Sequence, residues 1–168
     1  MPTLERTTLG ISTFQDHFYW AVLSGGRQSP HLIDEHREPT PADKGDGALM
    51  EWFAVKFGNL IAQYQPSNGA FRLSISGPGR SQTREQMLRS VFPNAIFQLA
   101  CETSPSRIPT QARTSQSLTL HALGLPTPHG QRGFAPVSAV CDQMFGVRDP
   151  YWDRGQKEAI VVAWLELA

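Results

Sequence analysis

A glycine-rich segment in the middle of the chain could hold the phosphate of a nucleotide. Residues 76–80 read Ser-Gly-Pro-Gly-Arg and follow an alternating apolar run, residues 70–76, that predicts a strand. Residues 81–92 then predict a helix, and the N-terminus of a helix attracts anions. The segment lacks the lysine and the length of a P-loop and the third glycine of a dinucleotide fingerprint. A tight turn with a flexible backbone explains it equally well.

Arginines are concentrated in the same part of the chain. The 168 residues carry no net charge, but residues 72–132 contain seven arginines and only two acids. Arg80 and Arg84 lie in and just after the glycine-rich segment, and Arg107 follows the next expected strand. We expect these three at one edge of a sheet, where they could bind nucleic-acid phosphates. Scattered, solvated surface charges are the simpler alternative.

Alternating and apolar runs predict five strands, at residues 8–15, 18–23, 31–36, 70–76 and 94–101. The turns between the first three indicate an antiparallel meander. A strand, a long helix and another strand indicate a crossover to a parallel strand. We therefore expect an α/β fold with a five-stranded mixed sheet, three strands antiparallel and then two parallel, flanked by helices.

Apolar residues at three- and four-residue spacing predict the clearest helix over residues 49–64. A second helix is expected at residues 81–92, beginning at Ser81 and ending before Pro93. Further helices are expected at residues 110–123, ending at Gly124, and at residues 137–145. Residues 157–168 are ambiguous, because their β-branched residues favour a strand while their length and all-round apolarity favour a buried helix.

The cysteines and histidines form no recognisable site. Cys101 and Cys141 lie 40 residues apart, which fits neither a zinc motif nor a disulfide framework, so we expect two buried thiols. The five histidines are scattered, and no two share a helix face at a spacing of four. These residues predict no metal centre.

Composition limits the class of protein. A chain of this length, 40% hydrophobic and 18% charged, predicts one globular domain over residues 1–168. It contains no run of 18 apolar residues, and residues 1–10 lack an apolar signal core. We therefore expect a cytoplasmic protein that does not interact with membranes.

Four stretches resemble one family. Residues 9–23, LGISTFQDHFYWAVL, are similar to the opening LGIDPG…GY(A/G)VI of RuvC-type Holliday-junction resolvases. Residues 72–78, RLSISGP, look like that family's central strand, and residues 96–110 look like the strand and loop that follow. Residues 156–167, QKEAIVVAWLEL, resemble its closing helix. The resemblance spans nearly the whole chain and implies a ribonuclease H-like fold in which residues 157–168 are helical.

The resemblance also implies where a nuclease site would lie. In this family, carboxylates from the first strand, the central strand and the last helix hold two divalent metals. Here the corresponding positions are Ser12, Gly77 and Glu158, and the residue one turn before Glu158 is Gly155. We expect the first three to lie together at one edge of the sheet. One carboxylate cannot hold two magnesium ions.

Relocated acids are the alternative. Asp16 could substitute for the missing acid at Ser12, although strand geometry places it about 13 Å further along. Glu102, Asp149 and Asp153 could form a displaced cluster with Glu158 that binds magnesium or manganese, although loop acids and helix-capping acids are common. We predict a catalytically degenerate domain, without a cofactor, that binds nucleic acid or protein and could form a homodimer. A metal-dependent nuclease with relocated acids is the alternative function.

Overall fold

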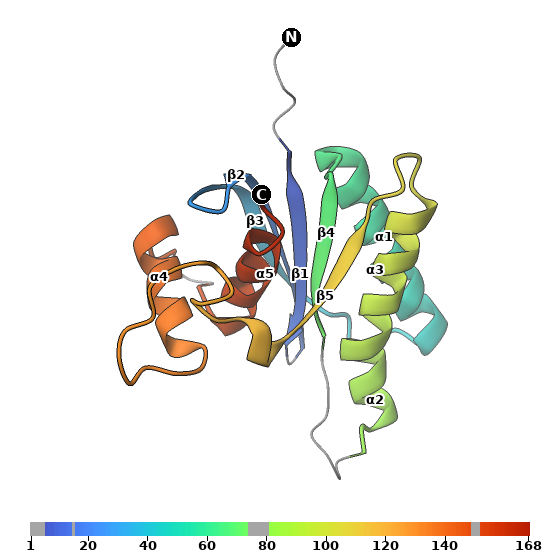
Figure 1. Ribbon diagram of the computed structural model, residues 1–168. Coiled ribbons are helices and arrows are strands. Elements are labelled where there is room, and N and C mark those ends of the chain that lie inside the picture. The colour runs from blue at the N-terminus through green and yellow to red at the C-terminus, as the bar shows by residue number, and fades with distance from the viewer. Residues whose placement is uncertain (1–5, 15, 74–80, 149–151) are drawn as a thin grey trace.

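The centre of the protein is a five-stranded mixed sheet (Figure 1), in a computed structural model that describes residues 6–14, 16–73, 81–148 and 152–168. Across the sheet the order is β3-β2-β1-β4-β5, and the strands are β1 (Thr8–Phe14), β2 (His17–Gly26), β3 (Ser29–Pro39), β4 (Asn68–Leu73) and β5 (Thr110–Thr114). The first three strands form an antiparallel meander, while β4 runs parallel to β1 and β5 parallel to β4. The expected mixed sheet is therefore confirmed.

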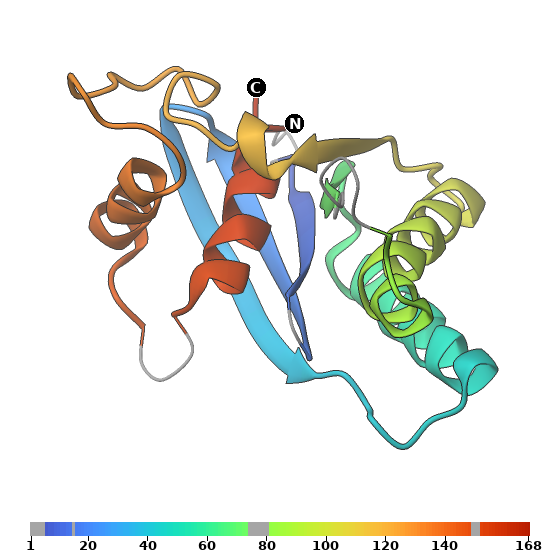
Figure 2. The ribbon, with the colours of Figure 1, turned by 90° about the horizontal axis from the view of Figure 1, so that it is seen from below.

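Two hydrophobic cores lie on opposite faces of this sheet (Figure 2). On one face, α1 (Asp46–Tyr64) and α3 (Phe92–Thr103) pack against β1 and β2 through a cluster of phenylalanines. On the other face lies α5 (Arg154–Trp164), with α4 (Ala135–Phe145) outside it. The apolar run of β2 is buried on both sides, which is why its sequence shows no polar face.

Gly10 of β1 lets α5 approach the sheet closely. A Cβ atom at this position would clash with the carbonyl oxygen of Ala159 and lie 2.8 Å from the Cβ of Ala163. Glycine removes that obstacle. The helix therefore rests on the strand backbone, and every residue from 155 to 164 is buried. This contact sets the distance between α5 and β1, and therefore how far the side chains of α5 reach toward the strand.

The predicted fifth strand, residues 94–101, is wrong: these residues belong to α3. A helical stretch runs continuously through α2 (Arg84–Gln86), the π-helical turn η1 (Met87–Val91) and α3. Pro93 does not end the helix, because it lies in the first turn of α3, where proline is tolerated, directly after the wide π turn. Pro93, Phe97 and Cys101 are buried at four-residue spacing, which is the helical pattern.

The predicted helix over residues 110–123 is also wrong. Its first part is β5, a short polar strand at the sheet edge that is held by pairing with β4 from Gly69 to Leu73. A 3₁₀ turn, η2 (Ser115–Ser117), follows, and one further turn ends at Gly124, whose φ is +74°. Leu118, Leu120 and Leu123 are buried around this turn.

The helix predicted over residues 81–92 begins after the N-cap Thr83 instead of at Ser81, and it continues to Thr103. The remaining predicted helices are confirmed. Residues 49–64 lie in α1, residues 137–145 lie in α4, and the ambiguous last segment forms α5, as the family resemblance implied. Among the residues that the structure describes, no helix has both the length and the apolarity needed to cross a membrane.

Candidate functional site

Ser12 and Glu158 meet between β1 and α5. Alternation along β1 turns Leu9 and Ile11 toward α1 and α3, so Gly10 and Ser12 face α5. The Ser12 hydroxyl donates a hydrogen bond to Oε2 of Glu158 at 3.4 Å, and both side chains are fully buried. The structure thus brings together two of the three positions that the resemblance aligned. The third, Gly77, lies outside the described residues.

Two arginines neutralise Glu158. The Nε of Arg72, on β4, lies 2.7 Å from Oε2, and the Nε of Arg154, on the first turn of α5, lies 2.9 Å from Oε1. Because an unpaired buried carboxylate would be strongly destabilising, these guanidinium groups stabilise Glu158 in its buried position. Each carboxylate oxygen is held by one cation.

Strand register explains why Arg72 reaches this position. The parallel pairing of β1 with β4 aligns Ile11 with Phe71, so the next residues along, Ser12 and Arg72, lie side by side. Arg72 also donates from Nε to the Ser115 hydroxyl at 3.3 Å. Within the described part of β4, the residue that contacts Glu158 is therefore a base.

Gly155, one turn before Glu158, has no room for a side chain. A Cβ atom there would overlap the ring of Tyr19, with 2.6 Å to Cζ and 2.7 Å to Cδ2. The ring is fixed in turn, because its hydroxyl donates to Oδ2 of Asp153 at 2.8 Å. Burial and this hydrogen bond raise the pKa of Tyr19. An aromatic ring thus fills the space that an acidic side chain would need.

Asp153 serves as the N-cap of α5. Its Oδ1 accepts a hydrogen bond from the backbone N–H of Gln156 at 3.0 Å, and its Oδ2 also accepts from Arg37 at 2.9 Å. A capping carboxylate satisfies a backbone donor that has no partner within the helix. This acid is occupied by the cap, the tyrosine hydroxyl and the arginine.

Of the other relocated-acid candidates, Asp149 lies outside the described residues, while Asp16 and Glu102 lie elsewhere. Asp16 is highly exposed in the turn between β1 and β2 and pairs with Arg89 at 3.4 Å. Glu102 is exposed on α3, across the sheet from Glu158. Across the described ranges, no three His, Cys, Asp or Glu side chains are grouped so that they could hold a metal ion.

The predicted grouping of the arginines is wrong for Arg107. Because residues 92–103 form a helix that runs back along the sheet, Arg107 arrives at the N-terminal ends of the parallel strands, beside Pro109, whose carbonyl oxygen accepts from Gly69 N–H. Arg84 begins α2 at the other end of the domain (Figure 1) and pairs with Asp46 of α1. Arg80 lies outside the described residues.

Arg72 and Arg154, which contact Glu158, are not among the predicted site residues, although each follows a recognisable sequence pattern. Arg72 alternates with the apolar residues of its strand and so had to face α5. Arg154 precedes Glu158 by four residues, the spacing of an ion pair on one helix face. The contact between Gly155 and Tyr19 follows no sequence pattern, because the two residues lie in different elements, α5 and β2.

Both cysteines are buried free thiols, as predicted. Burial raises the pKa of Cys101 and of Cys141 to about 12, so neither is a thiolate at neutral pH. Because the thiolate is the reactive form, neither thiol is prepared for nucleophilic chemistry.

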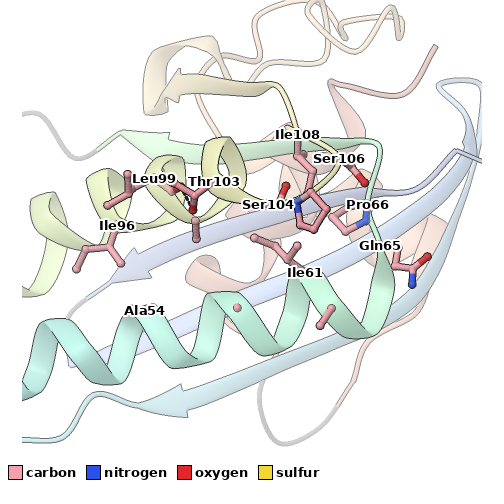
Figure 3. A pocket seen from close by; sticks show the side chains of 14 residues that line it. Ala54, Ile61, Gln65, Pro66, Ile96, Leu99, Thr103, Ser104, Ser106 and Ile108 are labelled. Atoms are coloured by element: carbon pink, nitrogen blue, oxygen red, sulfur yellow. Dashed lines mark hydrogen bonds between the residues drawn. The ribbon is translucent and has the colours of Figure 1, made fainter.

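An apolar groove of about 710 Å³ lies between α1 and α3, on the sheet face opposite Glu158 (Figure 3). No charged side chain lines it. Its walls include Ala54, Gly58 and Ile61 from α1 and Ile96 and Leu99 from α3. The groove offers no group for acid–base or metal chemistry.

The architecture is similar to that of resolvases of known structure. RuvC from Thermus thermophilus matches with a TM-score of 0.72 and 12% identity, over 95% of this chain and 92% of that one. T. thermophilus RuvC in complex with a Holliday junction substrate matches with a TM-score of 0.70 and 10% identity, over 95% of this chain and 91% of that one. The yeast mitochondrial Holliday junction resolvase matches with a TM-score of 0.65 and 12% identity, over 94% of this chain and 76% of that one. Neither protein-family models nor curated protein sequences give a match.

Proposed function

Because the chain has the ribonuclease H-like fold of RuvC, we propose that it is a catalytically degenerate domain that binds nucleic acid without cleaving it. The observation that carries this proposal is the pairing of Glu158 with Arg72 and Arg154. A two-metal mechanism needs several carboxylate oxygens that converge on the cations. Of the aligned positions Ser12, Gly77 and Glu158, only the last supplies a carboxylate, and arginines hold both of its oxygens.

The residues around Glu158 do not fit a pair of divalent metals. A cation would have to displace two guanidinium groups, and it would meet the uncharged hydroxyl of Ser12 rather than a second carboxylate. At Gly155 the ring of Tyr19 takes the space of a further ligand. Each of these features opposes metal binding separately, so restoring a single acid would not recreate the site.

Nucleic acid is the partner that these observations favour. One of the similar structures is a RuvC bound to a Holliday junction substrate, which shows that this fold can present a surface to branched DNA. In this chain, bases outnumber acids over residues 72–132. Arg80 and Arg84 remain our predicted contributors to that surface, whereas Arg107 lies at the opposite end. A protein-binding module is the outcome to expect if nucleic acid does not bind.

The proposal is tested by fluorescence anisotropy with labelled single-stranded DNA and a labelled four-way junction. Titrations are made in EDTA and in magnesium at equal ionic strength. We expect binding in both, with an affinity that falls steeply with salt, because each phosphate contact releases condensed counterions. No binding at low salt would exclude nucleic acid as the partner and favour a protein ligand.

A further inference from the structure

We propose that Arg154 binds a backbone phosphate of the nucleic acid directly, and that Arg72 is a positioning residue that makes this possible by neutralising Glu158. The inference rests on the function proposed above and names the contact that would replace metal-mediated binding. It follows from the charges, exposure and packing of the residues around Glu158.

The first observation is an imbalance of charge. Glu158 carries one negative charge and is paired with two guanidinium groups. Among the described residues, the other ion pairs around α5 each join one acid to one base: Asp153 to Arg37, Asp142 to Lys157, and Glu166 to Arg113. Glu158 is thus the acid around which positive charge is in surplus.

Exposure decides where this surplus can act. The side chain of Arg72 is only 15% exposed, whereas that of Arg154 is 51% exposed. Arg72 therefore serves the buried carboxylate, and the net positive charge is presented to solvent through Arg154. An anion that approaches this edge of the domain can therefore reach the guanidinium group of Arg154.

Arg154 is also held in place. Its Nε is tied to Glu158, and its guanidinium lies over the ring of Phe134, with 5.3 Å from Cζ to the ring centroid. A guanidinium fixed in this way loses little side-chain entropy on binding. Its planar fork of donors matches phosphate oxygens in a bidentate geometry.

The test compares Arg154→Ala with Arg107→Ala in the anisotropy titration in EDTA. Both variants lose one positive charge, but Arg107 lies at the other end of the parallel strands. For Arg154→Ala we expect roughly threefold to tenfold weaker binding at low salt and a salt slope reduced by about 1, which is the loss of one phosphate contact. Arg107→Ala should match the wild type in both quantities.

Glu158→Gln provides a readout that a purely structural role would not give. Removal of the carboxylate leaves both guanidinium groups with uncancelled charge, so we expect tighter DNA binding and a steeper salt dependence. A residue needed only for packing would give weaker or unchanged binding when replaced. Circular dichroism confirms that each variant is folded, and Arg154→Gln, which removes the charge but keeps a long polar side chain, replaces Arg154→Ala if that variant unfolds.

The possible failures are distinguishable. If the wild type binds DNA in EDTA and Arg154→Ala or Arg154→Gln binds equally well, the phosphate contact is wrong and the proposed function stands. If the wild type binds only when magnesium is present, the direct contact is likewise wrong. If the wild type binds no nucleic acid under any condition, both proposals are wrong.

Discussion

The Nε of Arg72 lies 2.7 Å from Oε2 of Glu158, so a base on the central sheet neutralises the buried carboxylate of the last helix. In a two-metal nuclease the corresponding space is filled by cations that the substrate shares. Here the positive charge next to Glu158 comes from the guanidinium group of Arg72. The pair compensates the charge of a fully buried acid beside Ser12.

Removal of Arg72 should therefore destabilise the fold. We expect Arg72→Met to lower the free energy of unfolding by roughly 3 kcal/mol, since a buried carboxylate loses its nearest partner. The double variant Arg72→Met/Glu158→Gln should recover most of this loss, because no buried charge remains. Urea denaturation of the wild type, both single variants and the double variant measures the coupling. Strictly additive effects would contradict the assignment.

Gly155 should not tolerate a methyl group. We expect Gly155→Ala to destabilise the protein by roughly 2 kcal/mol, because the new Cβ must displace the ring of Tyr19. Gly58→Ala is the matched control: it lies within α1, and a Cβ there meets no atom within 4 Å. The control should be stabilised by about 0.5–1 kcal/mol through helix propensity. Equal behaviour of the two variants in thermal unfolding would show that the space beside Gly155 is open.

Restoring one acid should not restore metal binding. In Ser12→Asp, the new carboxylate would pair with the arginines that already hold Glu158, so we expect no heat of manganese binding by calorimetry. The double variant Ser12→Asp/Arg72→Glu removes one guanidinium group and brings together three carboxylates, those of residues 12, 72 and 158. Its affinity for manganese should become measurable. Tight manganese binding by the wild type, lost in Glu158→Gln, would contradict the account.

The sheet was predictable because its main elements carry strong local signals. The alternation of β1 and the apolar run of β2 needed no tertiary information, and the heptad-like stripe of α1 is equally plain. The fifth strand was misplaced for a physical reason. The sequence Thr-Gln-Ala-Arg-Thr of β5 has no apolar pattern and is strand because it pairs with β4. Pro93 is typical of a helix end, but the π turn before it places the proline in the first turn of α3, where proline is tolerated.

The site divides in the same way. The contact of Ser12 with Glu158 followed from a family resemblance that aligned two elements far apart in sequence. The closure of Gly155 by Tyr19 could not be predicted, because it depends on how closely α5 rests on β2. Arg107 was misplaced because its position depended on the wrong assignment of α3.

The central claim is tested most directly by incubating a labelled four-way junction with the wild type and with Glu158→Gln in manganese, and resolving the products on a denaturing gel. The account predicts intact DNA with both proteins, even at protein concentrations that saturate the junction. Metal-dependent cleavage by the wild type that disappears in Glu158→Gln would contradict it, because Glu158 would then be a catalytic ligand rather than the partner of two arginines.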